Sequence, residues 1–137
     1  MKNDGRSAAE DVRDDTLTRA VIGCAIKVHK ALGMGLLESA YETCLAHELV
    51  EQGFSISRQV ALPVIYDGLR IDIGYRPDLI INSELIVEIK CVSQLAAIHE
   101  AQLLTYLRLS KIERGLLINF HSLPLSRGIK RRVLSRN

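Results

Sequence analysis

Three charged side chains interrupt the apolar strand segments of RPDLIINSELIVEIKC, at residues 76–91: Asp78, Glu88 and Lys90. Glu88 and Lys90 are two residues apart, so in a strand their side chains point to the same face. If residues 82–84 form a three-residue hairpin loop, Asp78 falls directly opposite Glu88. A loop one residue longer or shorter would change this pairing. Carboxylates opposed in this way repel each other unless a proton or a cation joins them.

Two kinds of chemistry are open to this cluster. Lys90 offers one positive charge and could form an ordinary ion pair on an exposed sheet face. That is the usual explanation for a short D…E-x-K match. A hard divalent ion such as magnesium offers more charge and prefers oxygen ligands. Because the simplest strand pairing makes the two carboxylates converge, we favour a functional cluster.

Helical patterns are predicted on both sides of this hairpin. Apolar residues recur at helical spacing from Thr16 to Leu32, with Asp14 or Asp15 as the cap and glycines 33–35 as the stop. A second helix is expected over residues 36–52, packed against the first. A third is expected over residues 94–109.

Strand patterns occupy the remaining segments. FSISRQVALPVIY, residues 54–66, alternates and is rich in β-branched residues, and Pro63 suggests a strand start, an edge or a bulge. Asp67-Gly68 predicts a two-residue hairpin turn. LRIDIGYRPDLII, LIVEIKCV and the fully apolar RGLLINF follow as strands. After His121 we expect a loop and then a short strand or helix.

The element order predicts an α/β domain. It reads α-α-β-β-β-α-β, and the helix between the third and fourth strands suggests a crossover, so the central sheet should be mixed and flanked by helices. The 137 residues are enough for one domain. We place that domain at residues 16–137 and a mobile polar tail at residues 1–15.

Composition excludes some classes of protein and leaves others open. The net charge is only +2, but a basic cluster gathers near the C-terminus: Arg127, Lys130, Arg131, Arg132 and Arg136. It could contact phosphates or simply be solvated. The three cysteines, Cys24, Cys44 and Cys91, lack the spacing of a disulfide framework or a zinc site. With neither a secretory signal nor a membrane-spanning segment, a reducing cytoplasm is expected.

Three motifs resemble those of a known group of enzymes. Pro77-Asp78 followed by Glu88-Ile89-Lys90 resembles the PD-(D/E)XK motif of the nuclease superfamily that includes the lambda exonuclease and RecB-type nucleases. GLLESAY, residues 35–41, is similar to the signature of the GxxExxY family within that superfamily. QLLTY, residues 102–106, resembles the Q-x-x-x-Y motif of RecB-type enzymes. The resemblance extends over about residues 17–133.

The resemblance implies a restriction-endonuclease-like αβββαβ core and a magnesium or manganese site. It implies that Asp78, Glu88, the Ile89 carbonyl and Glu38 bind the metal, and that Lys90 assists catalysis. Gln102 and Tyr106 would flank the site, and His99, three residues before Gln102, would face it. Tyr41 sits on the apolar stripe of its helix, so we expect a core position with its hydroxyl turned to the site.

These expectations leave three functions open. The first is a magnesium-dependent nuclease acting on DNA or RNA. The second is a catalytically silent module of the same fold that binds nucleic acid or a protein partner. The third is a plain α/β domain in which the motif is a structural ion pair. A domain this small has little surface to hold a long duplex, which favours a homodimer.

Overall fold

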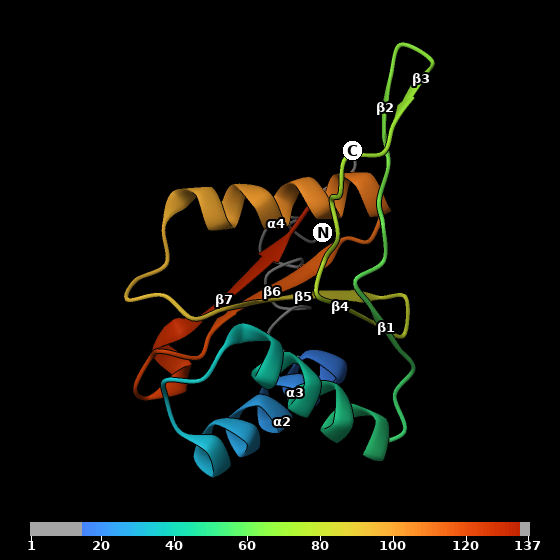
Figure 1. The fold of residues 1–137 in the computed structure, drawn as a ribbon. Helices are drawn as coiled ribbons and strands as arrows, with labels where there is room; N and C mark the ends of the chain where they lie inside the picture. The colour runs from blue at the N-terminus through green and yellow to red at the C-terminus, as the bar shows by residue number, and fades with distance from the viewer. Residues whose placement is uncertain (1–14, 135–137) are drawn as a thin grey trace, which may run out of the picture.

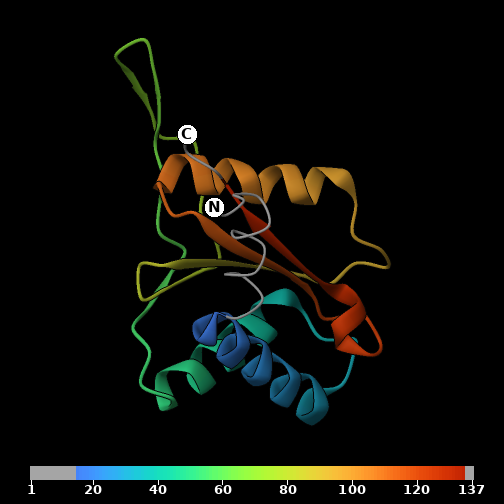
Figure 2. The same cartoon turned by 180° about the vertical axis from the view of Figure 1, so that it is seen from behind.

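The computed structural model describes residues 15–134, and Figures 1 and 2 show their arrangement from opposite sides. Residues 1–14 of the predicted tail and Arg136 of the basic cluster lie outside this range. Asp15, which the predicted boundary assigns to the tail, caps the first helix and forms an ion pair with Arg114. No helix in the described range is long and apolar enough to cross a membrane.

A mixed five-stranded sheet forms the centre of the fold. Its strands are β1 (Ile56–Arg58), β4 (Leu79–Ile81), β5 (Leu85–Lys90), β6 (Arg114–Asn119) and β7 (Ile129–Val133), side by side in that order. Among the strands of residues 15–134, only β5 and β6 run parallel, and the helix between them makes the crossover. The predicted α/β class with a mixed sheet is therefore confirmed.

Helices cover both faces of this sheet (Figures 1 and 2). Helices α2 (Thr16–Leu32) and α3 (Glu38–Glu51) pack on one face, and α4 (Ala97–Ser110) packs on the other. Two apolar clusters form the core, one on each side. Gly115 of β6 permits the close approach of α4, because a Cβ there would lie 2.8 Å from Leu103 Cδ1.

The predicted helices are present, with small differences at their ends. The first matches its predicted bounds of Thr16 and Leu32, with Asp15 as the cap and Gly33 as the stop. The second begins at Glu38 rather than residue 36, because residues 33–37 form a loop held by Tyr41. The third begins at Ala97 rather than residue 94 and ends at Ser110.

Two predicted strands are broken. FSISRQVALPVIY divides into β1 and β2 (Val64–Tyr66), because Gln59 adopts a left-handed φ of 53° that ends β1. LRIDIGYRPDLII divides into β3 (Leu69–Ile71) and β4. β2 follows directly after Pro63 and pairs only with β3, across the predicted Asp67-Gly68 turn. These two strands form a hairpin that protrudes from the body (Figure 1).

The C-terminal segment resolves the choice left open between a strand and a helix. A 3-10 turn, η1 (Leu125–Gly128), leads into strand β7. β7 pairs antiparallel with β6 and forms one edge of the sheet. Part of the basic cluster therefore lies on an edge strand, where Lys130 and Arg132 point to one face and Arg131 to the other.

Candidate active site

Asp78 and Glu88 meet at the start of β4, as the simplest pairing predicted. Ile81 pairs with Leu85 and Leu79 with Val87, so the register places Asp78 opposite Glu88. The amide of Asp78 donates a hydrogen bond of 2.7 Å to Glu88 Oε2. The amide of Ile89 donates one of 2.8 Å to Asp78 Oδ2. Each carboxylate is thus fixed by the backbone of the neighbouring strand.

Burial makes this pair of acids unusual. Glu88 is only 4% exposed. Burial, together with the neighbouring charge of Asp78, raises the pKa of Glu88 to about 8. Burial also raises the pKa of Asp78, against the opposing effect of its hydrogen bonds from Ile89 and Gln59. Two full negative charges are therefore disfavoured here without a proton or a cation.

Lys90 is linked to helix α4 rather than directly to the acids. Its Nζ lies 3.4 Å from Gln102 Oε1, and Gln102 Nε2 donates to the Tyr106 hydroxyl at 3.2 Å. Burial, followed by the charge of Glu88, raises the pKa of Tyr106. Gln102 and Tyr106 thus lie beside the acid pair, and their role at a site stays a prediction.

Glu38 lies at the same edge but does not join the acid pair. It is the first residue of α3, it is exposed, and its Oε2 accepts a hydrogen bond of 3.2 Å from the amide of Cys91. Its charge still contributes to raising the pKa of both Asp78 and Glu88. Among residues 15–134, no three histidine, cysteine or acidic side chains lie close enough to share one ion.

Tyr41 positions the loop that precedes Glu38. Its ring is fully buried and stacks on Phe120 with the ring centroids 4.4 Å apart. Its hydroxyl donates to the Gly33 carbonyl at 2.5 Å and accepts from the Leu36 amide at 3.3 Å. The hydroxyl thus bonds to the loop and not to the acids. The G-x-x-E-x-x-Y spacing therefore has a structural reason, since the tyrosine fixes the turn that starts the helix at Glu38.

His99 closes the first turn of α4. Its Nδ1 accepts a hydrogen bond of 3.0 Å from the Ala96 amide, and its own amide donates to the Ala96 carbonyl at 3.0 Å. Within the described chain, no hydrogen bond or ion pair joins His99 to Asp78, Glu88 or Lys90. We therefore place it in the scaffold that supports Gln102.

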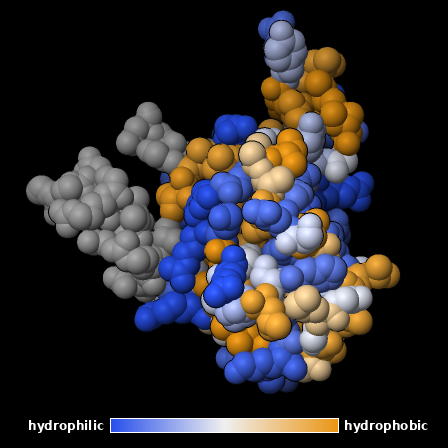
Figure 3. Space-filling model, turned by 90° about the vertical axis from the view of Figure 1, so that its left-hand side faces the viewer, coloured by the Kyte–Doolittle hydropathy of each residue, from blue (hydrophilic) through white to orange (hydrophobic). Residues whose placement is uncertain are grey.

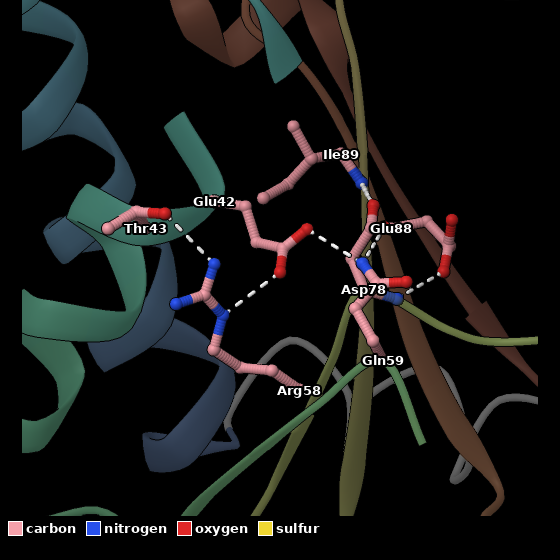
Figure 4. Close-up of polar contacts among 7 residues, drawn as sticks. All are labelled: Glu42, Thr43, Arg58, Gln59, Asp78, Glu88 and Ile89. Carbon is pink, nitrogen blue, oxygen red and sulfur yellow. Dashed lines mark hydrogen bonds and ion pairs between the residues drawn. The ribbon is translucent and has the colours of Figure 1, made fainter. Parts of the chain in front are cut away.

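A polar network behind Asp78, in which only Glu42 is buried, is not apparent from the sequence. Figure 4 shows Gln59 between Glu42 and Asp78, and its Nε2 donates to Glu42 Oε1 at 2.9 Å and to Asp78 Oδ1 at 3.0 Å. Arg58 holds the other oxygen of Glu42 at 3.0 Å. Glu42 stands four residues after Glu38, on the same helical face. In the sequence, only this spacing could have indicated that Glu42 lies near the acid pair.

Replacing Gln59 by Ala is expected to loosen Asp78. Asp78 Oδ1 then loses its donor, and Glu42 loses one of its two partners. Losing a residue that orients a metal ligand typically costs 10- to 100-fold in metal affinity, so we expect a loss of about that size. Calorimetric titration with Mn²⁺ measures it. Thr43→Val is the matched control, because Thr43 contacts Arg58 but not Gln59. Equal affinities for Gln59→Ala and the wild type would contradict this role.

The acid pair fits a divalent cation. Asp78 and Glu88 provide the hard oxygen ligands that such an ion prefers. Burial disfavours their negative charges, which a bound cation would neutralise. A cation between them would lower the pKa of both groups. The charge of Glu38 affects the pKa of both acids. To bind the same ion, its carboxylate would have to give up the hydrogen bond from the Cys91 amide. Ile89 supplies its amide to Asp78, and the role of its carbonyl stays a prediction.

A mixed sheet between two helical layers, with an Asp opposite a Glu-x-Lys on adjacent antiparallel strands, defines the restriction-endonuclease-like class of α/β folds. The family model described as the PD-(D/E)XK nuclease superfamily matches residues 15–132. The chain belongs to that superfamily. Comparisons with curated proteins and with solved structures give no significant match.

Proposed function

We propose that this protein is a nuclease that hydrolyses nucleic-acid phosphodiester bonds with Mg²⁺ or Mn²⁺. One observation supports this most strongly: the buried carboxylate of Glu88 and the half-buried carboxylate of Asp78 converge near Lys90, and burial and the charge of Asp78 raise the pKa of Glu88 to about 8. Carboxylates with perturbed pKa values in such a setting are typical of functional sites. Membership in a nuclease superfamily supports the same assignment.

Each residue has a role in this proposal. Asp78 and Glu88 hold the ion, with Glu38 and the Ile89 carbonyl as further ligands. When bound, the ion polarises a phosphoryl oxygen and lowers the pKa of water. Lys90 offsets negative charge that develops on the scissile phosphate. Gln102 holds Lys90 in place, and Tyr106 holds Gln102.

The finer assignment also belongs to this proposal. The loop geometry around Gly35, Glu38 and Tyr41 supports placing the chain in the GxxExxY family. The free thiols of Cys24, Cys44 and Cys91 support a reducing, cytoplasmic location. Exposed apolar residues on the β2–β3 hairpin, among them Ile65, Tyr66 and Leu69, support a homodimer, which sedimentation measures.

The second candidate is a catalytically silent module that binds nucleic acid or a protein partner. The position of Glu38 favours it, because this carboxylate bonds to the Cys91 amide and stands apart from the acid pair. A site that lacks its third acid would bind metal weakly. Binding without cleavage would then be the whole function.

Lys90→Ala separates the two candidates. For a nuclease, we expect the variant to lose at least about a hundredfold in the rate of Mg²⁺-dependent cleavage, because a lost donor to developing charge costs about that much. Cleavage of labelled DNA and RNA strands, with and without a chelator, measures this. Lys30→Ala is the control, since Lys30 is exposed on α2. Metal-independent binding that Lys90→Ala leaves unchanged, with no cleavage by the wild type, would favour the silent module.

A further inference from the structure

A polar cavity lies at the carboxyl ends of β5 and β6, next to the candidate active site. Its volume is about 250 Å³, and its polar lining comes from three segments: Ser93, Gln94, Asn119, Ser122, Arg127 and Lys130. Asn119 is the strand partner of Lys90. Neighbouring strands lie about 4.8 Å apart, so the wall of the cavity adjoins the backbone of Lys90.

The charge of this cavity is positive. Within the described residues, Arg127 and Lys130 form no ion pair. Lys130 is among the charges that lower the pKa of Glu100, after Arg132, and the Glu100 carboxylate is already paired with Arg132 at 2.5 Å. Helix α4 begins just after Leu95 of the cavity wall, and a helix N-terminus favours anions. The cavity therefore favours an anionic group.

The wall of the cavity is built by close packing. Asn119 is buried, and it fixes the loop after β5 by accepting from the Val92 amide at 3.0 Å and donating to the Val92 carbonyl at 2.8 Å. Gly128 lets η1 approach the end of β6 and the turn after it, because a Cβ there would collide with Ser122 Oγ and lie 2.7 Å from the Asn119 carbonyl. Ser93, Ser122 and Arg127 are thus held around the cavity by fixed backbone.

The strand register connects this cavity to the acid pair. Lys130 pairs with Leu117, and Leu117 pairs with Glu88. Lys130, Leu117, Glu88 and Asp78 therefore form one row across the sheet, on the face that α4 covers. With two strand spacings between them, the backbones of Lys130 and Glu88 are about 10 Å apart. Figure 3 shows hydrophilic residues gathered over the side of the molecule on which η1 and the start of α4 lie.

We propose that this cavity binds a phosphate group of the nucleic-acid strand, next to the phosphate at the acid pair. The proposal rests on the proposed function for the choice of ligand. Two cationic side chains, hydroxyl groups and an amide match the groups that contact phosphates in nucleic-acid complexes. The backbone of Lys130 lies about 10 Å from that of Glu88, so a phosphate in the cavity is a different one from the scissile phosphate at the acid pair. The bound group is either an internal phosphodiester or the phosphate at a strand end.

Lys130→Gln and Arg127→Gln test the proposal. We measure binding of a fluorescent single-stranded oligonucleotide in a chelating buffer, so that cleavage plays no part. Each variant is expected to bind about tenfold more weakly, and the slope of log affinity against log salt should fall by about 0.7 for each lost phosphate contact. Arg131→Gln is the matched control, because it removes the same charge from the opposite face of β7. Thermal unfolding confirms that the variants are folded.

The outcomes distinguish this proposal from the proposed function. Equal losses for Lys130→Gln and Arg131→Gln, no change in either cavity variant, or no binding by the wild type would overturn the phosphate site. Losses confined to the cavity variants, in a protein that cleaves nothing with Mg²⁺, would keep the site and remove the catalytic role. Repeating the titration with and without a terminal phosphate identifies the source. If the cavity variants lose affinity only for the strand with a terminal phosphate, the cavity binds the strand end. If they lose affinity equally for both strands, the cavity binds an internal phosphate.

Discussion

Glu88→Gln and Asp78→Asn are each expected to lower metal-dependent cleavage at least about a hundredfold, because metal ligands contribute several kcal/mol of transition-state stabilisation. The glutamine can still accept the hydrogen bond from the Asp78 amide through its carbonyl oxygen, so Glu88→Gln should stay folded. The asparagine can keep only one of the two hydrogen bonds that Asp78 accepts, from Ile89 or from Gln59. Cleavage rates and Mn²⁺ affinity, measured side by side, show the loss.

Glu84→Gln is the control for both variants. Glu84 is exposed in the loop of the same hairpin, where its carboxylate lies 3.4 Å from Arg114. Its substitution should leave cleavage and metal affinity near the wild-type values. If Asp78→Asn instead changed the free energy of unfolding while cleavage stayed intact, the motif would be a structural ion pair and not a catalytic one.

The free energy of unfolding should fall as the pH rises, when divalent metal is absent. The pKa of Glu88 is about 8 in the folded protein and near 4.5 when unfolded. The folded state therefore binds more protons than the unfolded state between these values. The stabilisation is fully present below pH 4.5 and is lost as the pH passes through about 8. Its size is on the order of a few kcal/mol. Burial of Asp78 acts in the same direction.

Urea unfolding across this pH range measures the effect. Glu88→Gln should remove most of the slope, because the glutamine does not titrate, and Glu84→Gln should retain it. Glu100 has a lowered pKa, since Arg132 donates a hydrogen bond to it, so its contribution changes only below pH 4.5. A stability that stays flat from pH 5 to pH 8 in the wild type would contradict the buried acid pair.

The sequence predicts the local features of the site well. Side chains alternate along a strand, and hairpin loops have few common lengths, so the pairing of Asp78 with Glu88 follows from counting. Helical spacing likewise places Gln102 and Tyr106 on one face of α4. These relations depend on neighbours in sequence, which explains why the structure confirms them.

Contacts between distant segments could not be predicted in this way. Gln59 reaches Asp78 only because it leaves the strand region with a φ of 53°, and a β-rich pattern gives no sign of that break. Glu42 faces Gln59 because α3 packs beside β1, which is a tertiary contact. The distance of Glu38 from the acid pair depends on where its helix starts, and helix ends are set partly by loop contacts such as those of Tyr41.

Calorimetric titration with Mn²⁺ at pH 7 tests the central claim most directly. The titration is repeated in buffers of different ionisation enthalpy, so that proton release can be measured. Glu88, with a pKa of about 8, is mostly protonated at this pH and must lose its proton to bind the ion. We predict saturable binding that releases about one proton, and loss of both the binding and the proton release in Glu88→Gln. Absence of saturable binding, or equal binding by Glu88→Gln, would contradict the assignment of Asp78 and Glu88 as the metal site of a nuclease.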